Sequence, residues 1–285
     1  MVADRIRVLA AAVLFSTGGA AIKATALDAW QVASFRSAVA AVALLLLAPS
    51  TRRRWTWRTL LVGLAYAATM ILYVAGNKLT TAANTIFLQD TAPLYIVLFG
   101  PLLLGERIRR REVVFMAALA VGMALFFVAR QPASDTAPNP ALGNLLAAAA
   151  GVTWALTIVG LRWLGRGLQR ADDAAAAVVC GNIIASVAAL PGALPVATAG
   201  VADAALILYL GVLQIGLAYL FLTSGMRGVP ALEASLLLLL EPVLNPVWAW
   251  MVHGETPAPL ALAGAGVILA ATAVHTWREG RSGRG

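Results

Sequence analysis

The sequence predicts an all-α integral membrane protein, with ten transmembrane helices arranged as two inverted five-helix repeats around a central cavity. Three observations lead to this fold class. Hydrophobic residues make up 61% of the chain and charged residues only 12%, whereas a soluble domain carries roughly 25% charged residues. The apolar residues fall into runs long enough to cross a bilayer core of about 30 Å. Landmarks in the first half of the chain also recur in the second half at a constant spacing.

The apolar runs are predicted to be helices, because backbone groups inside lipid must be satisfied within their own segment. The runs are continuous, and they lack the alternation that strands of a transmembrane barrel would show. The longest connection, from Arg130 to Ala141, contains three prolines and no apolar pattern. We therefore expect a first repeat over residues 1–130, a linker over 131–141 and a second repeat over 142–285. The predicted spans are 6–26, 30–48, 59–77, 84–104, 112–129, 142–163, 174–190, 203–225, 230–252 and 258–277.

The repeat is carried by a proline and a Gly-Glu pair. Pro93 and Gly105-Glu106 recur 149 positions later as Pro242 and Gly254-Glu255. Between these landmarks each half is predicted to contain one apolar helix. If each half crosses the bilayer five times, the second half must enter from the opposite side. Inverted repeats of this kind are typical of secondary transporters, whose substrate site lies near the midplane between the repeats.

Lysine and arginine predict the orientation. With a cytoplasmic N-terminus, only Lys23, Lys78 and Arg130 of the 21 basic residues lie at outer ends, and Arg36 lies within a span. All the others lie at inner ends, as the positive-inside rule requires. Both termini are then cytoplasmic and the protein is expected in the inner (plasma) membrane. The net charge of +8 is explained by topology and by contact with anionic lipid, without nucleic acid as a partner.

The first span has features of a secretory signal peptide. Arg5 and Arg7 precede the apolar run, and Ala24-Thr25-Ala26 resembles a small-residue cleavage site. The run is nevertheless long enough to cross the membrane, and its removal would leave nine helices and break the repeat. We therefore expect it to be a retained helix.

Five-helix units that end in an apolar stretch with a proline and then Gly-Glu resemble the EamA-type members of the drug/metabolite transporter superfamily. The segments that carry the resemblance are Asp90–Pro93, Leu240–Val243 and Phe35-Arg36-Ser37, together with the two Gly-Glu pairs. The amino-acid exporters are the branch that the chain resembles most. The resemblance implies a ten-helix exporter whose central cavity is lined by the third, fourth, eighth and ninth helices and their neighbours. The chain departs from internal symmetry at Glu241, because the equivalent position is Ala92.

Other function classes lack their characteristic residues. The chain has two histidines and one cysteine, and no pair has the spacing of a zinc site. There is no G-x-x-x-x-G-K-[ST] loop for ATP, no paired acid and base of the kind a lipid-modifying enzyme would need, and no filter motif of a channel. We therefore expect no enzyme activity, no metal and no cofactor. A facilitator or channel for small solutes, or a membrane-embedded lipid-modifying enzyme, remains the alternative.

Three ionisable residues lie well inside spans, where charge is costly and usually faces a cavity or a partner. Arg36 and Asp90 lie six residues into their helices and so at similar depth, which predicts a structural ion pair. Asp90 as a substrate or proton site is the competing hypothesis. Glu241 either binds backbone groups freed by nearby prolines or faces the cavity. Pro93 and Pro242 are candidate hinges, although they could equally shape a static bundle.

Polar and aromatic residues recur at helical spacing on several spans and so share faces. One such stripe usually joins helices, whereas stripes on several helices predict an aromatic-lined cavity that binds a small molecule. We expect amino acids, aromatic ones or a broad range, to be exported by alternating access. The sequence does not fix the oligomeric state, and a monomer is compatible with it. The candidate substrate-binding residues are Thr17, Tyr73, Asn77, Gln89, Tyr95, Trp154, Gln214, Glu241, Asn245 and Trp248.

Overall fold

The computed structural model describes residues 2–53, 55–104, 110–164, 170–197, 199–225, 228–229 and 231–282, and within these ranges its regular elements are all helices. Most of the described residues within the predicted spans are helical. The first half contains α1 (Val2–Ser16), α2 (Gly18–Ala24), α3 (Ala29–Leu47), the 3₁₀-helix η1 (Pro49–Arg53), α4 (Trp57–Leu79), α5 (Ala82–Gln89), α6 (Ala92–Leu104) and α7 (Arg110–Val128). The second half contains α8 (Pro140–Leu164), α9 (Arg170–Ala193), α10 (Val201–Leu208), the π-helix η2 (Tyr209–Leu217), α11 (Ala218–Gly225), α12 (Ala231–Leu238), α13 (Leu240–His253) and α14 (Pro259–Ser282).

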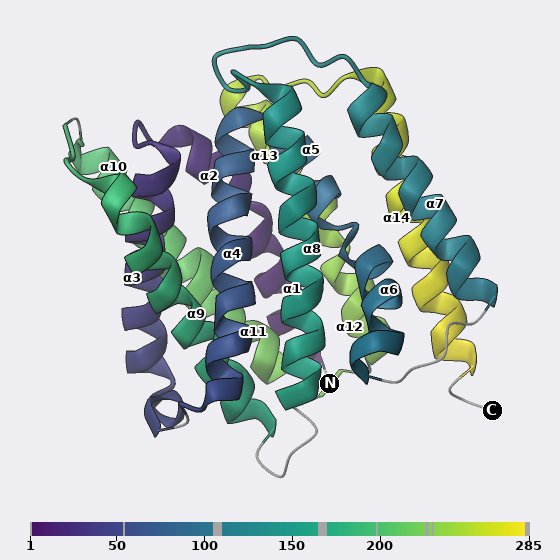
Figure 1. Ribbon diagram of the computed structural model, residues 1–285, viewed down its shortest axis with the longest axis horizontal. Coiled ribbons are helices and arrows are strands. Elements are labelled where there is room, and N and C mark those ends of the chain that lie inside the picture. The colour runs from purple at the N-terminus through teal and green to yellow at the C-terminus, as the bar shows by residue number, and fades with distance from the viewer. Residues whose placement is uncertain are drawn as a thin grey trace.

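The helices form a membrane-type bundle. Among the described residues, eight helices are long and apolar enough to cross a membrane, and Glu112–Val128 is a shorter apolar helix. The start of α1 and the end of α14 lie at the same end of the bundle (Figure 1). We call this the terminal end. The connection between α7 and α8 arches over the opposite end (Figure 1), which we call the distal end.

The prediction of one continuous helix through each proline landmark, over residues 84–104 and 230–252, is wrong. Residues 84–104 are divided into α5 and α6 at Asp90 and Thr91, and residues 230–252 are divided into α12 and α13 at Leu239. The Thr91 hydroxyl donates to the Leu88 carbonyl at 2.6 Å, which satisfies one acceptor at the end of α5. Pro93 and Pro242 lie in the first turn of the following helix, where a missing N–H costs no hydrogen bond. The prolines therefore follow the helix breaks and do not kink a continuous helix.

The two breaks are related by the sequence repeat. Shifting α5 (Ala82–Gln89) by 149 residues gives residues 231–238, which are the bounds of α12 (Ala231–Leu238). The same shift takes Asp90 to Leu239. Identical bounds at the sequence offset indicate that the repeat extends from residue pattern to backbone geometry.

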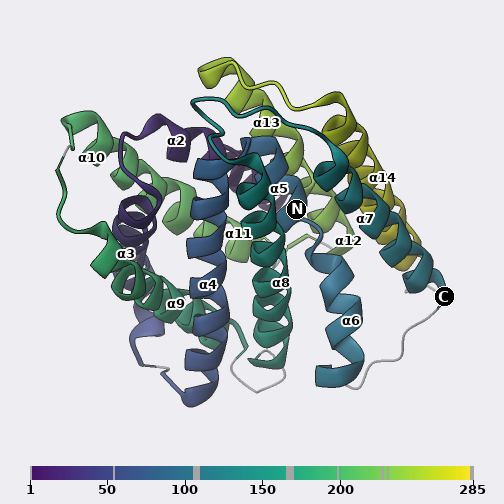
Figure 2. The same cartoon turned by 45° about the horizontal axis from the view of Figure 1, so that its top comes forward.

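The main packing contacts between helices of the two halves have equivalent contacts related by the repeat. The helix α4 packs on α8 just as α11 packs on α1, and α5 and α6 pack on α8 just as α12 and α13 pack on α1. The pairs α3 with α9 and α7 with α14 join equivalent helices of the two halves. In both views α7 and α14 run side by side at the edge of the bundle, beside α6 and α12 (Figures 1 and 2).

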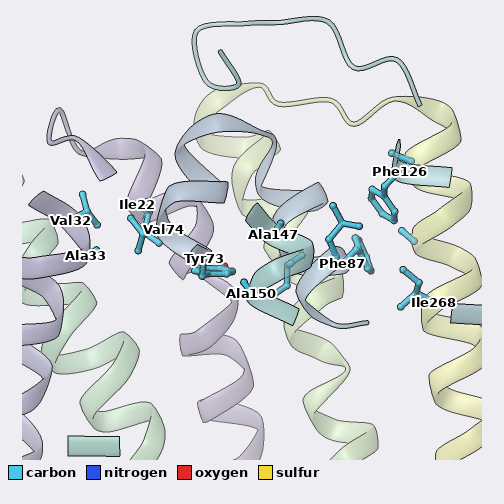
Figure 3. Close-up of a cluster of buried hydrophobic side chains, with 14 of the residues drawn as sticks. Ile22, Val32, Ala33, Tyr73, Val74, Phe87, Phe126, Ala147, Ala150 and Ile268 are labelled. Atoms are coloured by element: carbon cyan, nitrogen blue, oxygen red, sulfur yellow. The ribbon is translucent and has the colours of Figure 1, made fainter. Parts of the chain in front are cut away.

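A hydrophobic core joins the two halves. It includes Ile22, Val74 and Phe87 from the first half and Ala147 and Ile268 from the second (Figure 3). Phe87 and Phe126 pack with ring centroids 6.0 Å apart. Many other apolar side chains point outward and are exposed on the protein surface, as expected for a bundle whose periphery contacts lipid chains.

Candidate functional site

A cavity of about 350 Å³ lies between the two halves. Its volume is at the lower end of the roughly 300–1,000 Å³ that small-molecule sites occupy. The lining comes from both halves and includes side chains on both sides of the α5–α6 and α12–α13 breaks. The lining residues are Phe15, Arg36, Tyr66, Met70, Tyr73, Gln89, Asp90, Ala92, Pro93, Trp154, Ile158, Gln214, Ile215, Tyr219, Leu222, Leu238, Leu239, Glu241, Pro242, Ile268, Leu269 and Thr272.

Half of the residues predicted to bind substrate line this cavity: Tyr73, Gln89, Trp154, Gln214 and Glu241. The Gln214 side chain donates to the Phe15 carbonyl at 3.4 Å. Within the described part of the chain, the side-chain oxygens of Gln89 and Gln214 have no hydrogen-bond partner. Buried acceptors of this kind are costly unless something donates to them. These two oxygens are therefore available to a bound polar group.

The other five predicted residues do not line the cavity. The hydroxyls of Thr17 and Tyr209 are 2.8 Å apart, the Tyr95 hydroxyl donates to the Met123 sulfur at 3.5 Å, and the Trp248 indole donates to the Ser16 hydroxyl at 2.9 Å. Asn77 and Asn245 are fully buried outside the lining. The contacts of Thr17 and Trp248 join α1 to elements of the second half, so these residues connect helices.

Arg36 and Asp90 line the same cavity, but within the described residues the structure contains no ion pair between them. The Arg36 guanidinium instead contacts the Met70 sulfur at 3.3 Å and lies 6.0 Å from the centroid of the Tyr73 ring. The predicted structural ion pair is therefore not formed in this conformation. The estimate of equal depth was compatible with a shared cavity, but depth gives no lateral distance between two helices.

The two carboxyl groups of the cavity lie at the helix breaks. Asp90 ends α5, and Glu241 is in the first turn of α13. Both residues line the cavity. Glu241 is half-buried and faces the cavity, and in the described part of the chain it has no hydrogen bond to the backbone near Pro242 and Pro246. The cavity-facing alternative for Glu241 is the one that fits the geometry.

Aromatic rings form much of the cavity wall. The ring of Tyr219 packs edge-on against Phe15 at 5.3 Å and against Tyr66 at 6.3 Å between centroids. The Asn182 amide donates to the Tyr66 hydroxyl at 3.3 Å, which fixes that ring. Tyr73 is also buried and belongs to the hydrophobic core (Figure 3). Such a wall can receive apolar or cationic groups of a ligand.

The distal end of the bundle is closed by a buried ion pair. The Lys23 ammonium is 2.9 Å from the Glu255 carboxylate, and their side chains are only 2% and 3% exposed. Lys23 also donates to the carbonyls of Thr80 and Thr136, and Glu255 accepts from the Ala82 amide at 2.9 Å. These contacts join α2, the α4–α5 connection, the linker and the segment after α13.

The second Gly-Glu pair, Gly254-Glu255, forms part of this closure. Gly254 ends α13 with a φ of 65°, a left-handed conformation that glycine adopts without steric cost. Glu255 then turns back toward Lys23. The first pair, Gly105-Glu106, lies outside the described residues.

Sequence reasoning missed several lining residues. Tyr66, Met70 and Tyr219 recur at helical spacing with predicted site residues and could have been included on that ground. Leu269 and Thr272 of α14 carried no comparable signal, since the last helix was not expected at the cavity. Among the described residues, no group of three His, Cys, Asp or Glu side chains could hold a metal ion.

Known proteins resemble this chain over most of its length. The model of the EamA-like transporter family matches residues 6–128 and 141–277. A protein of Archaeoglobus fulgidus described as an uncharacterized transporter is 25% identical over 211 residues, which cover 74% of this chain and 73% of that protein. A solved structure described only as a crystal structure of a protein superposes with a TM-score of 0.64, at 23% identity and with 98% of each chain covered, and it supports the fold. The family model covers most of both halves, and the chain therefore belongs to the EamA-like transporter family, whose members are membrane transporters.

Proposed function

We propose that this protein is a secondary transporter that exports small metabolites, with amino acids as the expected solutes, by alternating access. The observation that carries the proposal is the cavity between the two halves, which is lined from both of them. A site at the interface of two repeats can be exposed to either side of a membrane when the repeats move against each other. The cavity's aromatic rings and polar side chains suit a small solute with both apolar and polar groups.

The inverted arrangement of the halves is supported by their exchangeable packing and by the identical offset of their helix breaks. Discontinuous helices at the substrate site are a recurring feature of secondary transporters, because unwound backbone can bind a solute or change conformation. Pro93 and Pro242 each follow a break and line the cavity. We assign these two breaks as hinges, with the prolines fixing the start of the moving half-helices.

Closure of the distal end supports a state that is sealed on one side. The cavity includes Leu222, three residues from the end of α11, so it extends toward the terminal end. The Lys23–Glu255 contacts lie at the other end. In the orientation given by the positive-inside rule, the terminal end is cytoplasmic. The protein then lies in the inner membrane in a state closed to the outside. One chain contains the whole cavity, so a monomer is sufficient.

The proposal is tested by transport in proteoliposomes. Purified protein is reconstituted, liposomes are preloaded with one unlabelled amino acid at a time, and uptake of the labelled form is followed with and without a proton gradient. A carrier gives saturable uptake and counterflow that protein-free liposomes lack. Flux that never saturates would indicate a channel, and absence of flux for every amino acid and amine tested would contradict export of such solutes.

A further inference from the structure

Arg36 is a buried cation in the cavity wall, and among the residues that the structure describes it has no anionic partner. Arg36 is only 2% exposed, and in the described part of the chain its Nε has no hydrogen-bond partner. One terminal nitrogen donates to the Met70 sulfur at 3.3 Å, which is a weak acceptor. An unpaired charge in a low-dielectric interior is costly and normally binds a counter-ion. The guanidinium therefore has donors available to an anionic ligand.

The carboxyl groups that could neutralise Arg36 occupy another part of the same cavity. Asp90 and Glu241 line it at the α5–α6 and α12–α13 breaks. The Arg36 guanidinium lies 6.0 Å from the centroid of the Tyr73 ring, and Tyr73, Tyr219 and Glu241 line the same cavity. Arg36 and Glu241 form no ion pair in the described structure. The cavity keeps opposite charges apart beside an aromatic wall.

This separation matches a ligand that carries both charges. A guanidinium binds a carboxylate through a planar fork of donors, and a carboxylate pair accepts hydrogen bonds from an ammonium group. We propose that Arg36 binds the carboxylate of the transported solute, and that Asp90 and Glu241 bind its ammonium group. Arg36 is then the residue that selects zwitterionic solutes over amines of the same shape. This inference rests on the proposed transport function, because it assigns the cavity to the solute.

Three related probes separate the two charges of the ligand. Phenylalanine carries both, phenethylamine lacks the carboxylate, and N-acetylphenylalanine lacks the ammonium group. Binding of each to purified protein in detergent is measured by titration calorimetry, so the readout does not depend on flux. The wild type should bind phenylalanine most tightly. Equal binding of phenethylamine, or no binding of any of the three probes, would overturn the proposal.

The decisive variant is Arg36→Gln, with Arg58→Gln as its matched control. Arg58 loses the same charge, but it is exposed and lies over Trp57 and Trp163, outside the cavity. Loss of a charge-assisted hydrogen bond should weaken phenylalanine binding of Arg36→Gln by roughly 10- to 100-fold. Binding of phenethylamine should stay near its wild-type value, and Arg58→Gln should bind every probe like the wild type.

Thermal unfolding distinguishes a binding role from a structural one. Arg36→Gln removes an unpaired buried charge, so its melting temperature should equal or exceed that of the wild type. A large fall in melting temperature with equal loss of all probes would show that Arg36 holds the bundle together, and would overturn the inference. Counterflow by the same variants reconstituted in liposomes separates the two proposals. If Arg36→Gln transports with an unchanged preference for phenylalanine, only the assignment of Arg36 as the carboxylate-binding residue is rejected. If the probes bind but no flux is measured, only the transport function is rejected.

Discussion

Lys23 at the end of α2 and Glu255 just after α13 form a buried ion pair, 2.9 Å between Nζ and the carboxylate oxygen, that ties the first half of the chain to the second at the distal end. Both side chains have further partners on the backbone of the α4–α5 connection. The pair therefore closes this end of the bundle with two fully desolvated charges. In a transporter that alternates its access, such a contact must break when the distal side opens.

Removing one member of this pair should destabilise the protein more than removing both. Lys23→Met or Glu255→Met leaves a buried charge without its partner and should lower the free energy of unfolding by about 3–5 kcal/mol. The double variant Lys23→Met/Glu255→Met should recover most of that loss, because no charge remains. Melting temperatures in detergent measure both effects. Arg5→Ala is the control, since the Arg5–Glu233 pair is partly exposed and should cost about 0–1 kcal/mol. Additive losses in the double variant would show that the two residues do not act as a pair.

Both ends of the chain should lie in the cytoplasm. The sequence puts most basic residues at the predicted inner ends of the spans, whereas Lys23 and Lys78, the two lysines at the distal end, are engaged by carbonyls and Glu255. A fluorescent protein fused after Gly285 should fold and fluoresce, while alkaline phosphatase fused at the same place should be inactive. An active phosphatase fusion would place this end outside and contradict the orientation derived from the arginines.

Two large aromatic residues should respond differently to truncation. Tyr73 lines the cavity, so Tyr73→Ala should reduce counterflow of bulky amino acids more than that of alanine. Trp248 lies outside the lining and donates to Ser16, so Trp248→Ala should mainly lower stability, by about 3–5 kcal/mol. Flux per folded molecule and melting temperature are measured for both, with Trp154→Ala as a second cavity variant. If Trp248→Ala changed solute preference at an unchanged melting temperature, it would belong to the site after all.

Two glycines test the close approach of helices. A Cβ added at Gly143 would lie 2.6 Å from the Thr80 backbone nitrogen and 2.7 Å from its Cβ. Gly143→Ala should therefore force α8 away from the end of α4 and cost about 1–3 kcal/mol. At Gly266 in α14 an added Cβ would meet no heavy atom within 4 Å, so Gly266→Ala should be neutral or gain up to about 1 kcal/mol from helix propensity. Equal melting temperatures for the two variants would contradict the packing of α8 on α4.

The prolines in the sequence predicted the helix break in each repeat only in part. Pro93 and Pro242 identified the repeat but suggested kinks within continuous helices. In the structure the helices end earlier, at Asp90 and Leu239, where no proline occurs. A residue pattern marks where a helix can start, because proline lacks an N–H. The preceding helix stops at the residue four positions before each proline, Gln89 or Leu238, because the proline has no N–H for that carbonyl and its ring clashes with it.

The sequence by itself determined the membrane class, the helical character of the apolar segments and the repeat offset of 149 residues, because length, hydropathy and residue spacing are properties of the chain alone. It also identified Tyr73, Gln89 and Glu241 as residues facing a common interior. Only the tertiary structure decided that Trp248 and Thr17 hold helices together, and that Arg36 and Asp90 share a cavity without pairing. Periodicity gives the face of a helix on which a side chain lies, and residue count gives its depth. The rotation of each helix toward its neighbours, and the lateral distance between two charges at one depth, are fixed only when all the helices pack together.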